Sequence, residues 1–335
     1  MGKTWAFHGL TSRGIVQTAE RSPRCKSPFF PLPFNPFSLK RGVLVFLNGR
    51  FVPEEKAVIS VFDRGFLYGD GLFETIRIVN GKPFRWREHI ERMRAGAEFL
   101  KIKLPYGANQ LRRIAGELVA RNKMPDSILR VNFSRGTGPV GYSPRNADKS
   151  TLVMSLRAGP RFNQKNPQLW KLIISSFRLG ANDPLTRIKT SNKLPQILAR
   201  AQADDAGADE ALLLNTDGYV AEGTSSNVFW VKRGAIYTPP LESGILPGVT
   251  RTVVFEIARK LRVPIREKNG RVWDLAQSDG VFLSLSSWGI VEVNSLNGKT
   301  LKTTDTIGRI RLIYQKAVGL QINQNFTSLP ASRKS

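Results

Sequence analysis

Residues 211–232 read Ala211-Leu-Leu-Leu-Asn-Thr-Asp-Gly-Tyr-Val-Ala-Glu-Gly-Thr-Ser-Ser-Asn-Val-Phe-Trp-Val-Lys232. Apolar runs in this stretch flank Asn215-Thr-Asp-Gly218, and the turn-forming residues between them predict a β-hairpin. The strand at 227–232 then pairs with a strand at 235–238 about Arg233-Gly234. The stretch therefore predicts two successive hairpins.

The segments on either side of these hairpins alternate between strands and helices. Upstream, a strand at 172–176 precedes Lys189, after which apolar residues repeat at helical spacing over 194–201. Downstream, we expect a helix at 250–261 and a buried strand at 281–285.

The earlier part of the chain predicts an α+β unit. The pair Asn48-Gly49 between apolar runs is a strong hairpin signal. We expect two helices there, at 86–100 and 108–121, and five strands, at 43–47, 72–79, 128–134 and 152–156 with a short one directly after Asn48-Gly49.

These elements predict a division of the chain into five parts. Residues 1–42 are basic and rich in proline, show no amphipathic period, and are expected to lie outside the fold. The other parts are a small α+β domain at 43–156, a connection at 157–168, a larger domain at 169–325 and a tail at 326–335.

The composition excludes several kinds of site. The 335 residues include one cysteine, Cys25, and two histidines, His8 and His89. An intramolecular disulfide is impossible, zinc sites built from Cys and His are excluded, and we expect no metal and a reducing, cytoplasmic location. No uninterrupted apolar run approaches the roughly 20 residues that a membrane-spanning helix requires.

The net charge of +25 makes a nucleic-acid-binding protein one interpretation. Beyond residue 42, however, Lys and Arg are interspersed with Asp and Glu and form no long basic block. We therefore favour a generally basic surface without a nucleic-acid partner. A positively charged active site would also attract a small anionic substrate.

Lys189 stands out among the basic residues because of its position near the start of a predicted helix. The positive end of the helix dipole and burial both disfavour an ammonium charge there. A neutral amine is the form that attacks a carbonyl group and holds a Schiff base. On this local pattern alone, an ordinary surface lysine remains the alternative interpretation.

Several other segments have the chemistry to hold a phosphate-bearing heterocycle. Pro247-Gly248-Val249-Thr250 leads into a helix whose first-turn N–H groups can bind an anion. Arg92 can add a charge-assisted pair, and Glu222, at the end of a strand, can hold a protonated ring nitrogen. Hydroxyl groups are available from Ser284, Ser286 and Ser287. Each residue alone is equally consistent with an ordinary turn residue or a solvated charge.

Five motifs occur in one order along the chain. They are Asp63-Arg-Gly-Phe-Leu-Tyr-Gly-Asp-Gly-Leu-Phe-Glu-Thr75, Glu88-His-Ile-Glu-Arg92, Ile188-Lys-Thr-Ser-Asn-Lys-Leu194, Gly218-Tyr-Val-Ala-Glu-Gly-Thr-Ser-Ser-Asn-Val-Phe-Trp230 and Leu246-Pro-Gly-Val-Thr-Arg251. In these motifs the chain resembles the class IV aminotransferases, a pyridoxal-phosphate family that includes branched-chain and D-amino-acid transaminases and aminodeoxychorismate lyase. The resemblance runs from about Val43 to about Lys302.

The resemblance implies a fold and a role for individual residues. The fold would be α+β with two domains, a small α+β domain and a larger cofactor-binding domain with a β-barrel-like sheet. Lys189 would form the Schiff base with pyridoxal 5'-phosphate and move protons, while Glu222 would pair with the pyridine nitrogen. His89 would be mainly structural. The cofactor phosphate would be bound by Arg92, the Val249 and Thr250 amides and the Ser286 hydroxyl.

The family also implies a homodimer in which the cleft borrows a loop from the partner subunit. Within the family, the stretches at 134–142, 178–182, 188–194 and 208–212 are most similar to aminodeoxychorismate lyase. That lyase converts 4-amino-4-deoxychorismate to 4-aminobenzoate and pyruvate in folate biosynthesis. D-Amino-acid transaminases carry an Arg and a His where this chain has Val140 and Tyr142.

Val140 also departs from many of the lyases, which have an arginine before the Gly-Tyr pair. Another basic residue, Arg130 or Arg178, would then bind a substrate carboxylate, and Tyr142 would lie beside the substrate. A branched-chain or D-amino-acid transaminase stays open as an alternative and would need a keto-acid acceptor. A non-catalytic basic protein that binds anions or nucleic acid on this fold is a further alternative.

Overall fold

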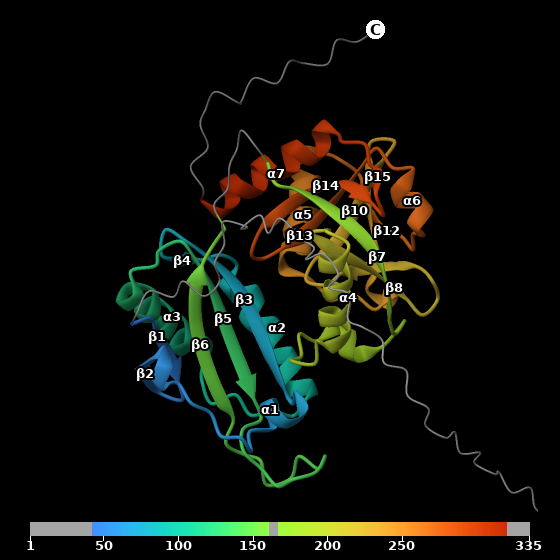
Figure 1. The fold of residues 1–335 in the computed structure, drawn as a ribbon. Coiled ribbons are helices and arrows are strands. Elements are labelled where there is room, and N and C mark those ends of the chain that lie inside the picture. The colour runs from blue at the N-terminus through green and yellow to red at the C-terminus, as the bar shows by residue number, and fades with distance from the viewer. Residues whose placement is uncertain (1–41, 161–166, 320–335) are drawn as a thin grey trace, which may run out of the picture. The chain divides into compact units, whose positions relative to one another are not determined.

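Two sheets organise the chain. In the computed structural model, which describes residues 42–160 and 167–319, six strands form the first sheet and nine form the second (Figure 1). The predicted extension at 1–42, except Gly42, and the predicted tail at 326–335 lie outside the described residues. Residues 161–166 of the predicted connection lie outside them as well, and the division into two domains stays a prediction.

The first sheet is an α+β unit with its strands in the order β2-β1-β6-β5-β3-β4. Its strands are β1 (Leu44–Leu47), β2 (Arg50–Pro53), β3 (Gly71–Val79), β4 (Lys82–Pro83), β5 (Ser127–Ser134) and β6 (Thr151–Ala158). The helices of this part are η1 (Glu54–Lys56), α1 (Arg64–Tyr68), α2 (Trp86–Phe99) and α3 (Ala108–Asn122). The long helices α2 and α3 lie against one face of the sheet (Figure 1).

Strand alternation decides which side chains face those helices. On β5, Leu129, Val131 and Phe133 are buried in the core that the sheet shares with α2 and α3. Successive side chains point to opposite faces of a strand, so Arg130 lies on the face away from the helices. The sequence pattern of β5 thus places a guanidinium group on the open face of a sheet whose other face is apolar.

The second sheet contains the strands β7 (Leu169–Leu179), β8 (Glu210–Asn215), β9 (Val220–Gly223), β10 (Asn227–Lys232), β11 (Ala235–Thr238), β12 (Ile265–Glu267), β13 (Gly280–Leu285), β14 (Gly289–Leu296) and β15 (Lys299–Thr300). Both hairpins predicted from residues 211–238 are present, as β8–β9 and β10–β11. The helices are η2 (Pro184–Arg187), α4 (Leu194–Asp205), η3 (Leu241–Ser243), α5 (Val249–Leu261), α6 (Val272–Ala276) and α7 (Asp305–Val318).

Six strands of the second sheet close into a barrel. The order β10-β13-β14-β7-β8-β9 returns to its start because β9 also pairs with β10, through Glu222 and Asn227. Leu283 on β13 points into the barrel core, while its neighbour Phe282 packs outward with α5 and α7. The predicted α+β fold with a barrel-like sheet is confirmed.

The second sheet and the helices packed on it go beyond the sequence prediction in several places. Strand β7 is longer than the predicted 172–176, because the polar residues of 175–178 interrupt its apolar pattern where the structure has a register shift. Strand β14 was not predicted. Neither was α7, although its residues Ile307, Ile310 and Tyr314 are buried in the core beside α5.

Among the residues that the structure describes, no helix is both long enough and apolar enough to cross a membrane. The cytoplasmic location expected from the cysteine content stays a prediction.

Leu283 tests the barrel core. Replacing this fully buried side chain with alanine is expected to lower the free energy of unfolding by about 2–5 kcal/mol, because it leaves a cavity among the inward-facing residues. The control is Leu169→Ala on β7, where the side chain is 40% exposed and the cost should stay below about 1 kcal/mol. Denaturant titrations of both variants measure the difference, and equal costs would contradict the assignment of Leu283 to the core.

Candidate active site

A pocket of about 710 Å³ gathers most of the predicted site residues. Its walls come from the open face of the first sheet, from α4, and from the strand ends and helix α5 of the second sheet. Seven of the nine predicted residues line it: Lys189, Arg92, Glu222, Val249, Thr250, Ser286 and Arg130. Residues that are up to 194 positions apart in the sequence therefore meet at one place (286 − 92 = 194).

The backbone of Lys189 is hydrogen-bonded to β3, a strand that lines the pocket. Its carbonyl oxygen accepts a hydrogen bond from the Phe73 N–H at 2.9 Å, and Nζ lies 4.6 Å from the centroid of the Phe73 ring. Burial, together with the nearby Arg92 guanidinium, lowers the pKa of Lys189 to about 7. A large fraction of this amine is therefore neutral near neutral pH, as nucleophilic attack requires.

One part of the sequence argument about Lys189 is wrong. Helix α4 begins only at Leu194, and Lys193 is its N-cap residue. The field of a helix dipole is confined to the first turn, so it does not account for the pKa at Lys189. The tertiary environment of Lys189 lowers the pKa instead.

Glu222 faces the pocket from the end of β9. Its Oε2 accepts hydrogen bonds from the Leu246 N–H at 2.9 Å and from Asn227 Nδ2 at 3.2 Å. Oε1 accepts no hydrogen bond from the residues that the structure describes. Burial raises the pKa of this carboxyl group to about 7, which a cationic partner at Oε1 would reverse.

Arg92 reaches the pocket from α2 through a buried ion pair that the sequence did not reveal. Its Nε and Nη2 donate to the two carboxylate oxygens of Glu74 at 2.8 and 2.7 Å, and its Nη1 donates to the Pro247 carbonyl at 2.9 Å. His89 Nδ1 lies 2.7 Å from Glu74 Oε2, and both side chains are buried. The sequence contained one sign of this ion pair, because Glu74 lies on the same face of β3 as the apolar residues Leu72 and Ile76.

The N-terminus of α5 and the end of β13 supply polar groups that fit a phosphate. No side chain caps α5 at Gly248, so none satisfies the N–H groups of its first turn. A Cβ atom at Gly248 would lie 2.0 Å from Asn227 Oδ1, so this approach requires glycine. Ser284 Oγ is buried without a hydrogen-bond partner in the described residues and lines the same pocket. An uncapped helix, an unpartnered hydroxyl, a carboxylate oxygen and a neutral amine together fit pyridoxal 5'-phosphate.

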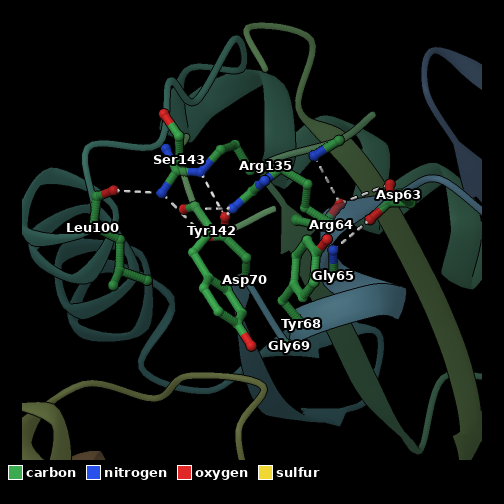
Figure 2. Close-up of polar contacts among 12 residues, drawn as sticks. Asp63, Arg64, Gly65, Tyr68, Gly69, Asp70, Leu100, Arg135, Tyr142 and Ser143 are labelled. Atoms are coloured by element: carbon green, nitrogen blue, oxygen red, sulfur yellow. Dashed lines mark hydrogen bonds and ion pairs between the residues drawn. The ribbon is translucent and has the colours of Figure 1, made fainter. Parts of the chain in front are cut away.

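Arg178 and Tyr142 do not reach this pocket within one chain. Arg178 Nη1 donates to the Ser175 and Phe177 carbonyls of its own strand, at 2.6 and 3.2 Å. Tyr142 is 89% exposed and its ring packs edge-on against Tyr68, with centroids 5.7 Å apart (Figure 2). The structure therefore separates both residues from Lys189.

The loop that carries Tyr142 is fixed by two arginines on one carboxylate (Figure 2). Arg64 donates to the Gly141 and Tyr142 carbonyls at 2.8 and 3.1 Å, and its Nε donates to Asp70 Oδ2 at 2.9 Å. Arg135 also donates to Asp70, at 2.7 Å. The cluster ties the loop to the start of β3, while the Tyr142 side chain stays exposed.

A match to one family model identifies the family of this chain. Residues 71–296 match the model described as amino-transferase class IV. The chain belongs to this family. It is a pyridoxal-phosphate-dependent enzyme, as the sequence motifs predicted.

Known members of the family differ in the reaction that they are named for. The aminodeoxychorismate lyase of Bacillus subtilis is 30% identical over 84% of this chain and 97% of its own length. The D-alanine aminotransferase of Staphylococcus epidermidis is 32% identical over 77% of this chain and 90% of its own. The crystal structure of the branched-chain aminotransferase of Thermoproteus uzoniensis with norvaline has a TM-score of 0.78 at 29% identity, covering 83% of this chain and 95% of that one.

The Glu74–Arg92 ion pair predicts how stability depends on pH. Burial alone would raise the pKa of Glu74, but Arg92 and His89 more than offset it and lower the pKa from 4.5 to about 2. A carboxyl group with a depressed pKa stabilises the folded protein above its unfolded pKa, and this contribution is lost as the pH falls from about 4.5 to 2. Charge neutralisation in Glu74→Gln should remove roughly 3 kcal/mol of this pH-dependent stability.

Urea titrations between pH 7 and pH 3 measure this effect as the difference between wild type and Glu74→Gln. The matched control is Glu117→Gln, since Glu117 pairs with Arg121 at 2.6 Å on the exposed surface of α3. An exposed pair of this kind should contribute less than about 1 kcal/mol. The buried ion pair would be contradicted if both variants lost the same free energy of unfolding. It would also be contradicted if the difference between wild type and Glu74→Gln did not become smaller in acid.

Proposed function

We propose that the protein is a pyridoxal-phosphate-dependent lyase that converts 4-amino-4-deoxychorismate to 4-aminobenzoate and pyruvate. The observation that carries this reaction is the position of Arg130, a cation that lines the Lys189 pocket and can bind a substrate carboxylate. The similarity to the Bacillus subtilis lyase over 97% of its length supports the same reaction. The resemblance of the stretches at 134–142, 178–182, 188–194 and 208–212 to the lyases points to the same reaction.

Arg130 is suited to a substrate carboxylate. Its guanidinium carbon lies 3.4 Å from the centroid of the Phe73 ring, and its hydrogen bonds go to two neutral groups, Asn132 Oδ1 at 3.0 Å and Thr75 Oγ1 at 3.4 Å. Within the part of the chain that the structure describes, it forms no ion pair. Burial and the neighbouring Arg157 lower the pKa of Arg130 to about 10, so the group stays cationic near neutral pH. A partly buried guanidinium with only neutral partners can bind a carboxylate through charge-assisted hydrogen bonds.

The residues around Lys189 would hold the cofactor by its two ends. The phosphate would contact Arg92, the Val249 and Thr250 amides and the Ser286 hydroxyl, with Ser284 Oγ as an additional donor. At the other end, Glu222 Oε1 would accept a hydrogen bond from the pyridine nitrogen and keep it protonated. When bound, pyridoxal 5'-phosphate supplies an electron-accepting ring that stabilises negative charge on the substrate.

Lys189 would then hold and move the proton of the reaction. Its neutral Nζ would hold the cofactor and would be free to act on the substrate once the substrate amine occupies that position. The freed amine is a base of suitable pKa to accept the proton from the substrate ring carbon. Loss of this proton and of the enolpyruvyl group as pyruvate leaves an aromatic ring, so no amino-group acceptor is needed.

Replacing Lys189 with alanine tests the cofactor site. The purified wild-type protein should show the absorbance of bound cofactor near the visible edge, and Lys189→Ala should lose that band because no covalent link can form. Turnover should fall by more than about 10³-fold because the variant also lacks the proton-transferring amine. Lys171→Ala, at an exposed position on β7, is the matched control. A non-catalytic anion-binding protein predicts no such band in either variant.

The product distinguishes the lyase from the transaminases. Incubation of the holoenzyme with 4-amino-4-deoxychorismate alone should release 4-aminobenzoate and pyruvate in equal amounts, measured by chromatography. Turnover of amino acids that depends wholly on 2-oxoglutarate or pyruvate, with no 4-aminobenzoate formed, would overturn the lyase and favour a transaminase.

We also propose that the protein is a homodimer. The segment at 58–67 exposes six apolar side chains, Val58, Ile59, Val61, Phe62, Phe66 and Leu67, and Val140 and Tyr142 are exposed on the loop at 136–145. Apolar surface of this kind favours a protein partner, and the family places a loop of one subunit at the cleft of the other. Sedimentation should show a dimer that Phe66→Glu weakens, whereas Trp273→Glu, at a residue 55% exposed on α6, should not. A wild-type monomer at micromolar concentration would contradict the dimer.

A further inference from the structure

We propose that Lys193 and Arg157, together with Arg130, form a second anion-binding subsite in the Lys189 pocket, which selects a substrate with two carboxylates. The inference rests on the proposed function in one respect only, that this pocket binds the substrate. None of the motifs discussed above assigns a role to Lys193 or Arg157.

Lys193 is a pocket cation with no ion-pair partner among the described residues. It precedes the first residue of α4, makes no side-chain hydrogen bond there, and lines the pocket. Across the described residues it forms no ion pair, and its side chain is partly buried. Burial lowers the pKa of its ammonium group, Glu222 opposes that shift, and Arg130 and Arg92 reinforce it. A partly buried ammonium that lies near other cations is costly unless an anion binds beside it.

Arg157 lies next to Arg130 on the open face of the first sheet. Arg130 pairs in register with Ser155, and Arg157 pairs with Ile128, so the two arginines are diagonal neighbours on adjacent strands. Diagonal neighbours lie roughly 7–8 Å apart, within reach of one small anion for side chains of this length. Arg157 also lines the pocket and has no ion-pair partner in the described residues.

The remaining cations of the pocket are already paired. Arg92 is bound to Glu74, and Arg200 donates to Asp204 Oδ1 at 2.8 and 2.9 Å. Among the described residues that line the pocket, Lys193, Arg157 and Arg130 therefore remain without an ion pair on the substrate side, whereas Glu222, a carboxylate without an ion pair, lies at the cofactor end. One carboxylate would leave this group of cations with excess positive charge, and two carboxylates would balance it more closely.

The proposed substrate has this charge pattern. It carries one carboxylate on the ring and one on the enolpyruvyl group, and both are separated from the reacting amine. With the amine at Lys189, the carboxylates can reach the walls formed by β5, β6 and the start of α4. Lys193 and Arg157 would then determine specificity without taking part in proton transfer.

Binding of unreactive probes to the holoenzyme tests this subsite. Benzene-1,3-dicarboxylate and benzoate are titrated calorimetrically into wild type, Lys193→Met and Arg157→Leu. Wild type should bind the dicarboxylate at least about tenfold more tightly, and each variant should lose about tenfold in dicarboxylate affinity and less than about threefold in benzoate affinity. Lys171→Met and Arg112→Leu, at exposed positions outside the pocket, are the matched controls and should bind both probes like wild type.

Two further measurements keep the outcome specific to charge. Each variant should retain the cofactor absorbance band, which shows an intact site, and Arg157→Lys should recover part of the lost dicarboxylate affinity. Equal binding of the two probes by wild type would overturn the subsite, as would unchanged dicarboxylate affinity in both variants. A holoenzyme that prefers the dicarboxylate but forms no 4-aminobenzoate would support the subsite and overturn the proposed reaction. A holoenzyme that forms 4-aminobenzoate but does not prefer the dicarboxylate would support the proposed reaction and overturn the subsite.

Discussion

The buried ion pair between Glu74 and Arg92 connects the two sheets at the site. Glu74 lies on the helix-facing side of β3, and the buried His89 holds its second oxygen. Arg92 spans from that carboxylate to the Pro247 carbonyl, immediately before the N-terminus of α5. A guanidinium held at three of its donors has little freedom to move, so the anion site at α5 is organised before any ligand binds. Burial and the same cation lower the pKa of Lys189, so Arg92 acts on both the anion site and the amine.

The two ends of the pocket carry different charged groups. At the cofactor end, Glu222 is a carboxyl group whose pKa is raised by burial, and Lys189 is an amine whose pKa is lowered by burial. Both values lie near 7, so each group can change its charge at low cost when a partner binds. At the other end, Arg130 on β5, Arg157 on β6 and Lys193 before α4 are cations that form no ion pair with any described residue. This asymmetry suits a ligand with a basic nitrogen heterocycle at one end and carboxylates at the other.

Local patterns in the sequence predicted much of the second sheet, because its hairpins have short turns and alternating apolar residues. The prediction was less complete where pairing is non-local. The polar residues in β7 concealed a strand that continues through a register shift, and α7 became visible only as a helix packed on the barrel. The helix-dipole argument at Lys189 failed because the sequence did not show where α4 begins. The helix starts at Leu194, too far along the chain for its dipole to act on Lys189.

The sequence by itself determined the family, since five motifs in order identify it, and it predicted seven residues that meet at the pocket. Tertiary structure alone decided which cations are free. Arg92 and Arg200 are occupied by carboxylates, and Arg178 is occupied by the carbonyls of its own strand. Arg130, which the sequence offered as a carboxylate-binding residue, and Lys193 and Arg157, to which no motif assigned a role, line the pocket without an ion pair to any described residue. The charged residues can be read from the sequence. Which of their charges are neutralised depends on distances of a few ångströms between segments that only the fold brings together.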